Sequence, residues 1–86
     1  MGREVRWSRQ AEEDLKRLDR RLRERIRRAV YRFAETGHGQ VKQLRRPLVG
    51  WSLRVGNWRV RFTVDETADT IFIRTVDSRG RAYRRE

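Results

Sequence analysis

The chain of 86 residues contains no cysteine and only one histidine, His38. Without cysteine, a disulfide framework, a thiolate metal site and a cysteine nucleophile are excluded. A single histidine cannot form a histidine-based metal site or a Ser-His-Asp triad. The sequence also has no glycine-rich nucleotide-binding loop. We therefore expect neither a bound metal nor a cofactor.

Long hydrophobic runs are missing as well. A membrane-spanning helix needs roughly 18 or more apolar residues in succession, and no stretch of the chain approaches that length. The first ten residues, MGREVRWSRQ, lack the apolar run of a signal peptide. We therefore expect a cytoplasmic protein with no membrane partner. Because a chain this short cannot be split into two parts that each bury a useful core, residues 1–86 are expected to form a single domain.

Basic residues, in contrast, are abundant. Lysine and arginine number 23 against 12 acidic residues, which gives a formal net charge of +11 at pH 7. Such an excess favours polyanionic partners. It is also uneven, since residues 36–64 hold six basic residues and no acidic one. High net charge with low hydropathy is typical of disorder too, but three Trp, two Tyr and three Phe at ordered spacings favour a folded domain.

The first 37 residues predict a short strand followed by two helices. Residues 3–7 alternate between polar and apolar side chains, as a strand does. Ser8 is placed to cap a first helix, and Asp19 to cap a second helix that ends at Gly37, with apolar residues at helical spacing in both. A short link between two helices is typical of an antiparallel helical hairpin.

The second half changes to the alternation of strands. Residues 51–55 and 58–64 each place their apolar side chains on one side, and Gly56-Asn57 between them is a type II′ hairpin signal. Residues 70–76, TIFIRTV, predict a further strand that is apolar enough to be central. The sequence therefore predicts an α+β fold of order β-α-α-β-β-β, in which a small antiparallel-rich sheet is backed by the N-terminal helical hairpin.

Counting outward from the predicted turn places Arg54 directly opposite Arg59, with Arg61 one diagonal step away. Opposed like charges are unfavourable, by something like the 0.2 to 1 kcal/mol scale of cross-strand pairs. An acidic residue from elsewhere can neutralise the pair, or the side chains can extend into water. Alternatively, the arginines form an anion site, since guanidinium groups bind phosphate oxygens well. Arginines around Tyr83 in the segment SRGRAYRRE would extend that site, and an exposed tyrosine can stack on an unpaired RNA base.

LRVGNWRVRF followed by RAYR resembles the RelE/ParE superfamily of toxins from bacterial type II toxin-antitoxin systems, and most of all its RelE-type mRNA interferase branch. VRWSRQAEEDLKRLDRRLRERI is similar to the opening strand and helical hairpin of that family. The resemblance implies a small sheet backed by two helices, a cognate antitoxin, and cleavage of mRNA on the ribosome by attack of the 2′-hydroxyl on the adjacent phosphate.

The resemblance also implies roles for individual residues. Arg54, Arg59 and Arg79 match basic positions of the family and would bind phosphate and stabilise transition-state charge, while Tyr83 would stack on a base or assist proton transfer. The wider RNA-binding set then comprises Lys42, Arg45, Arg61, Arg81 and Arg84.

The sequence departs from the family at two positions that matter for proton transfer. Ser78 stands where many relatives have histidine, and Ser52 where some have lysine. Lys42, expected in a loop, is a further candidate for the site, and His38 is expected to be a loop residue rather than a catalyst. Because no conventional general base remains, two alternatives to a nuclease stay open: a ParE-type inhibitor of DNA gyrase, and a non-catalytic module that binds RNA or the ribosome.

Overall fold

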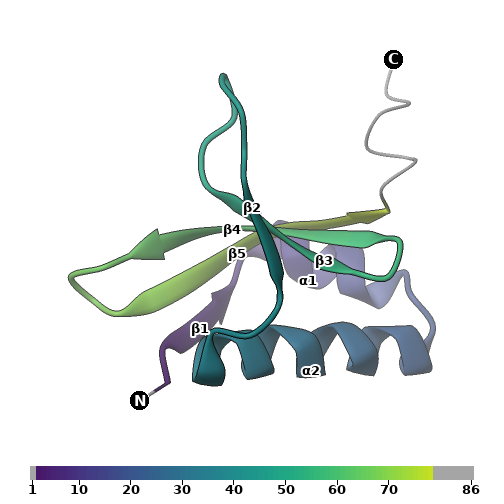
Figure 1. The fold of residues 1–86 in the computed structure, drawn as a ribbon. Coiled ribbons are helices and arrows are strands. Elements are labelled where there is room, and N and C mark those ends of the chain that lie inside the picture. Colours follow the sequence, from purple (N-terminus) through teal and green to yellow (C-terminus); the bar gives the residue numbers. More distant parts are fainter. Residues whose placement is uncertain (1, 79–86) are drawn as a thin grey trace.

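The computed structural model describes residues 2–78, which form five strands and two helices (Figure 1). In chain order these are β1 (Glu4–Trp7), α1 (Arg9–Lys16), α2 (Arg20–Thr36), β2 (Gln40–Gln43), β3 (Trp51–Val55), β4 (Trp58–Asp65) and β5 (Thr70–Ser78). The sheet order is β1-β5-β4-β3-β2, with β1 parallel to β5 and the remaining pairs antiparallel. The predicted α+β class is confirmed.

Both helices begin where the sequence predicts, and α2 also ends at the predicted glycine. The Ser8 hydroxyl accepts a hydrogen bond from the Ala11 amide at 3.0 Å, and the Asp19 carboxylate accepts one from the Leu22 amide at 2.8 Å. Gly37 ends α2 in the left-handed conformation, with φ of 80°. These caps satisfy backbone groups that a helix leaves unpaired at its ends.

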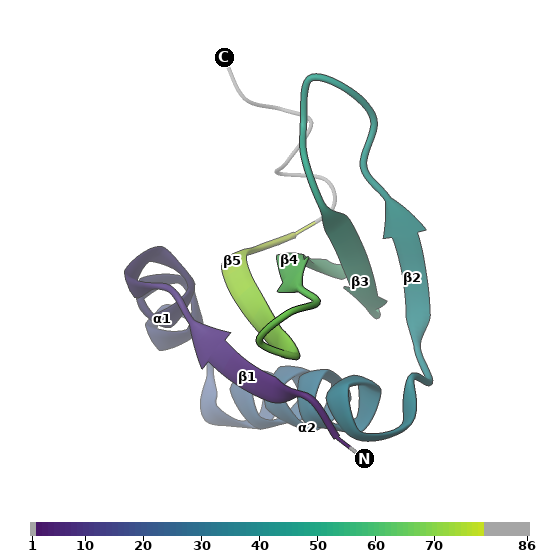
Figure 2. The same cartoon turned by 90° about the vertical axis from the view of Figure 1, so that its left-hand side faces the viewer.

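Both helices lie on the same side of the sheet. Figure 2 shows α1 alongside β5 and α2 running beneath β1 and β3. The largest fully buried side chains lie between these two layers: Leu15, Ile26, Val30, Val60, Ile71 and Ile73. Each side chain of this kind contributes about 1.5–3 kcal/mol when it is removed from water. The opposite side of the sheet, which we call the outer face, has no helix against it in the described chain.

The structure adds one strand that the sequence did not predict. β2 pairs with β3 in antiparallel register, with Lys42 opposite Ser52. Lys42 therefore belongs to an edge strand of the sheet, and the expectation that it lies in a loop is wrong. β2 was missed because QVKQ contains a single apolar residue, Val41, and so offers no alternation to recognise.

No helix within residues 2–78 is long and apolar enough to cross a membrane.

Candidate functional site

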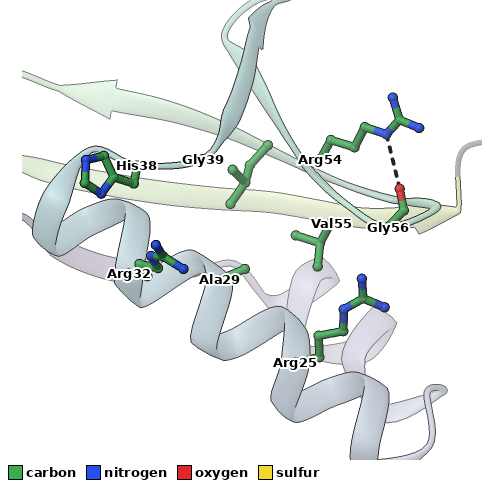
Figure 3. A pocket seen from close by; sticks show the side chains of 9 residues that line it. Arg25, Ala29, Arg32, His38, Gly39, Arg54, Val55 and Gly56 are labelled. Carbon is green, nitrogen blue, oxygen red and sulfur yellow. Dashed lines mark hydrogen bonds between the residues drawn. The ribbon is translucent and has the colours of Figure 1, made fainter.

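The hairpin of β3 and β4 forms in the register that the sequence predicts. All five predicted pairs are present, so Arg54 lies directly opposite Arg59. Gly56 has φ of 62°, as the first position of a type II′ turn requires. The Arg54 Nε–H donates a hydrogen bond to the Gly56 carbonyl oxygen at 3.2 Å (Figure 3). This hydrogen bond holds the Arg54 side chain toward the tip of the hairpin, which eases its repulsion from Arg59.

The outer face carries two rows of side chains that run across four strands. The first row, in the order β2, β3, β4 and β5, is Gln40, Arg54, Arg59 and Asp77. The second row, in the same order, is Lys42, Ser52, Arg61 and Thr75. Because neighbouring strands are about 4.8 Å apart, each row spans about 14 Å. Four of the predicted cations, Lys42, Arg54, Arg59 and Arg61, thus share one face.

A carboxylate lies among these cations. Asp77 is opposite Arg59 in register, and its Oδ2 atom is 4.0 Å from Nη2 of Arg61. The side chains of Arg61 and Asp77 are 29% and 32% exposed, respectively, so both are sheltered yet open to solvent. The suggestion that an acid from elsewhere neutralises the arginines is therefore confirmed in part, since one carboxylate lies opposite Arg59 and near Arg61.

The second row contains two polar atoms without a hydrogen-bond partner in the described part of the chain. Arg61 Nε and Thr75 Oγ1 are buried and have no hydrogen-bond partner within the described residues. Buried polar atoms are normally paired, because an unpaired one costs about 1–3 kcal/mol. Together with the 4.0 Å ion pair, these atoms indicate that the described residues hold the Arg61 side chain only weakly.

Asp77 reaches the outer face because β5 contains a bulge. The register of β4 and β5 shifts by one residue between Arg61 and Phe62, so that Phe62 pairs with Ile73 but Arg61 pairs with Thr75. Without this shift, Asp77 would lie opposite Trp58 on the side that faces the helices, because a one-residue slip reverses every side chain. The bulge instead buries Val76 and turns Asp77 outward.

Residues at the start of the chain hold the bulge in place. The Ser8 hydroxyl donates a hydrogen bond to the Arg74 carbonyl at 2.7 Å, and the Ser8 amide donates one to the Ile73 carbonyl at 2.9 Å. Farther along α1, Asp14 accepts a hydrogen bond from the Val76 amide at 2.9 Å and is only 7% exposed. β1 pairs with β5 only as far as Ile73, so Asp14 supplies the acceptor that a longer β1 would have provided.

The connection between β2 and β3 projects from the sheet on the side away from the helices (Figure 1). It carries Arg45, which is exposed, and two exposed apolar side chains, Leu48 and Val49. Gly50 lets this loop pass close to β4: its φ is 108°, and a Cβ there would lie 2.5 Å from the Phe62 carbonyl oxygen. Arg45 therefore lies beside the outer face on a loop, rather than in either row.

A hollow that Arg54 also lines lies between β3 and α2 (Figure 3). It has a volume of about 350 Å³, and its nine lining residues include Arg25, Arg32 and His38 but no acidic residue. Its apolar lining comes from Ala29, Leu53 and Val55. His38 is thus in a loop, as expected, and lies by α2 rather than in the rows of the outer face.

The remaining predicted residues, Arg79, Arg81, Tyr83 and Arg84, lie outside the described residues. Sequence reasoning missed Asp77 and Thr75. The signal that could have found them is a change of phase in the last strand, where the buried apolar positions are 71 and 73 but then 76. Within residues 2–78 there is no group of three or more His, Cys, Asp or Glu residues that could hold a metal ion.

Comparison with solved structures identifies the class of fold. The toxin-antitoxin complex RelBE2 from Mycobacterium tuberculosis contains a chain that matches with a TM-score of 0.83 and 28% identity, covering 92% of this chain and 93% of that one. A RelB-RelE complex from Methanococcus jannaschii matches with a TM-score of 0.73 and 24% identity, covering 92% and 95%. The YoeB dimer from Staphylococcus aureus matches with a TM-score of 0.69 and 24% identity, covering 90% and 97%. The fold is thus that of the RelE and YoeB toxins.

The sequence itself decides the family. Residues 5–83 match the family described as ParE toxin of type II toxin-antitoxin system, parDE. No curated protein sequence matches the chain significantly. The chain therefore belongs to the ParE toxin family of type II toxin-antitoxin systems, within the RelE/ParE superfamily, which confirms the resemblance noted from its sequence.

Proposed function

We propose that this toxin is a ribosome-dependent endoribonuclease that cleaves mRNA. The observation that carries the proposal is the gathering of Arg54, Arg59, Arg61 and Lys42 on the outer face of the sheet. Arg54 and Arg59 are directly opposed across the hairpin, and Asp77 is the single carboxylate among the eight residues of the two rows. Such a cluster suits a ligand that is itself strongly negative, as the phosphate backbone of RNA is.

The chemistry needs these cations more than it needs a cofactor. Attack of the 2′-hydroxyl on the adjacent phosphate places additional negative charge on the phosphate oxygens in the transition state. Arginines that bind two of these oxygens stabilise that charge and hold the phosphate in line for attack. Arg59 and Arg61 are half-buried and so are the most restrained of the group. Arg79 and Tyr83 would join them from the C-terminal segment.

We further propose that a cognate antitoxin is the protein partner. RelBE2 of Mycobacterium tuberculosis is a toxin-antitoxin complex, and this chain shares its fold. An acidic, amphipathic segment would complement a surface that combines Arg45 with the exposed Leu48, Val49 and Trp51. By covering the outer face, such a segment would keep RNA away from the arginines.

Inhibition of DNA gyrase is the second candidate, because the matching family carries the ParE name. RelE-like and ParE-like activities can share one fold, so the fold does not separate them. The two candidates differ in which macromolecule is damaged.

The test is induced expression followed by mapping of mRNA 5′ ends and of DNA breaks. We expect codon-phased mRNA cleavage with the natural chain and its loss with Arg59→Ala. Arg27→Ala, which removes the same charge from an exposed position on α2, is the matched control and should cleave normally. Growth arrest with intact mRNA and accumulated DNA breaks would contradict the nuclease and favour gyrase. Harmless expression of the natural chain would leave a non-catalytic RNA- or ribosome-binding module.

A further inference from the structure

We propose that Asp77 is the general base of the RNA cleavage, accepting the proton of the attacking 2′-hydroxyl. This inference rests on the proposed nuclease function and deepens it. It addresses the difficulty that the sequence raised, since the positions where relatives carry histidine or lysine hold Ser78 and Ser52 here.

The two rows of the outer face offer one group suited to this role. Arginine and protonated lysine have only donors, so they cannot take a proton. The hydroxyls of Ser52 and Thr75 are far weaker bases than a carboxylate. Asp77 is the single acidic residue in the eight positions of the two rows, and its carboxylate is an acceptor when ionised.

The position of Asp77 relative to the arginines fits the geometry of the reaction. The 2′-hydroxyl and the phosphate that it attacks belong to the same nucleotide, so a base must lie beside the phosphate-binding groups. Asp77 is opposite Arg59, and its Oδ2 is 4.0 Å from Arg61 Nη2. That separation is longer than a good hydrogen bond, so a phosphate bound by Arg61 would leave the carboxylate oxygens able to accept from the neighbouring hydroxyl.

The carboxylate is also well restrained. Asp77 lies within the paired part of β5, opposite Arg59 of β4, and the preceding residue, Val76, donates its amide hydrogen to Asp14 at 2.9 Å. The Asp77 side chain is 32% exposed, so substrate can reach it. A base held at a fixed place on a strand, and accessible from one side, is the arrangement that proton transfer requires.

The step balances without any further reactant. The 2′-hydroxyl gives its proton to Asp77 while its oxygen forms a bond to phosphorus, and the bond from phosphorus to the 5′-oxygen breaks. The 5′-oxygen leaves with the electron pair of that bond and takes a proton from water, and Asp77 later releases its proton to solvent. The products are a 2′,3′-cyclic phosphate and a free 5′-hydroxyl.

A competing role for Asp77 is that of a simple counterion, which would weaken RNA binding by neutralising Arg61. The two roles predict opposite results for Asp77→Asn, which keeps the shape of the side chain but removes its charge. If Asp77 is the base, the substitution lowers the cleavage rate. If Asp77 is only a counterion, the substitution tightens RNA binding and leaves the cleavage rate unchanged or higher.

The experiment measures single-turnover cleavage of mRNA on programmed ribosomes with saturating purified toxin. We expect Asp77→Asn to cleave about 10²- to 10⁴-fold more slowly, the usual contribution of a general base, with ribosome affinity equal or tighter. Glu4→Gln is the matched control: Glu4 is an exposed carboxylate on β1, paired with Arg6 at 3.3 Å, and its loss should leave the rate unchanged.

Chemical rescue provides a second, independent readout. Asp77→Ala leaves space for a small carboxylate, so added formate should raise its cleavage rate, whereas chloride at the same ionic strength should not. Rescue requires a folded variant and a missing proton acceptor, and a merely structural role would not produce it. If Asp77→Asn fails to fold by thermal melting, the formate response of Asp77→Ala decides the question.

The outcomes separate the two proposals. If the natural chain cleaves and Asp77→Asn cleaves within about twofold of it, Asp77 is not the base and only this inference fails. If Asp77→Ala is slow but does not respond to formate, the inference is likewise overturned. If the natural chain does not cleave mRNA on ribosomes at all, the proposed nuclease function fails and the assignment of Asp77 fails with it.

Discussion

The arginines of α2 and those of the outer face differ in their surroundings more than in their number. α2 carries seven arginines, six of them exposed, and pairs such as Arg20 with Glu24 lie in open solvent at 3.5 Å. Exposed pairs of this kind contribute about 0–1 kcal/mol. On the outer face, Arg59 and Arg61 are half-buried, and Arg61 Nε has no partner within residues 2–78. Burial and opposed charge, rather than the count of arginines, therefore locate the candidate site.

The largest effect that would test this comparison is the loss of cleavage on removing Arg61. We expect Arg61→Ala to lower the single-turnover rate about 10²- to 10³-fold, as the loss of one transition-state donor typically does. Arg27→Ala removes the same charge from α2 and should stay within about twofold, since exposed substitutions rarely exceed 0.5 kcal/mol. Equal losses in both variants would show that net charge controls activity, and that the arginines of the outer face do not differ in function from those of α2.

The outer face also depends on the other helix, because Asp14 of α1 accepts a hydrogen bond from the Val76 amide of β5. Replacing Asp14 by alanine leaves the Val76 amide without its acceptor, because the described part of β1 pairs with β5 only as far as Ile73. An unsatisfied buried amide costs about 1–3 kcal/mol, so we expect that loss of unfolding free energy in urea denaturation. Asp14→Asn keeps an acceptor oxygen and should lose less. Equal losses would show that the carboxylate charge, rather than the acceptor, is what β5 requires.

The parts of the fold that the sequence predicted depend on local signals. Gly56-Asn57 sets the register of the β3–β4 hairpin, and its five pairs follow by counting. Ser8 and Asp19 cap their helices through hydrogen bonds to residues three positions away. Such short-range geometry can be read directly from the chain, and it placed Arg54, Arg59 and Arg61 correctly.

The missed features depend on contacts between distant residues. The bulge in β5 is held by Asp14, 62 positions before Val76, and that partnership has no local signature. The strand β2 exists because β3 offers it a free edge, although QVKQ alone shows no strand pattern. Asp77 was therefore missed although the sequence placed the three arginines on one face, because the side of the sheet on which Asp77 lies depends on the bulge.

The smallest effect concerns Arg54, the exposed arginine of the first row. Its Nε donates to the Gly56 carbonyl at 3.2 Å, which leaves its terminal nitrogens free to meet a phosphate without burial. One such contact to single-stranded RNA contributes about 0.7 to the slope of log affinity against log salt. Arg54→Ala should therefore lower that slope by about 0.7. The ratio of the RNA affinity at 50 mM salt to that at 200 mM salt would then be roughly two- to threefold smaller than for the natural chain. Titration of labelled RNA at several salt concentrations measures this slope, with Arg28→Ala on α2 as the control that should leave it unchanged. If Arg28→Ala reduces the slope as much as Arg54→Ala does, RNA also contacts α2, and the outer face is only part of a larger basic surface.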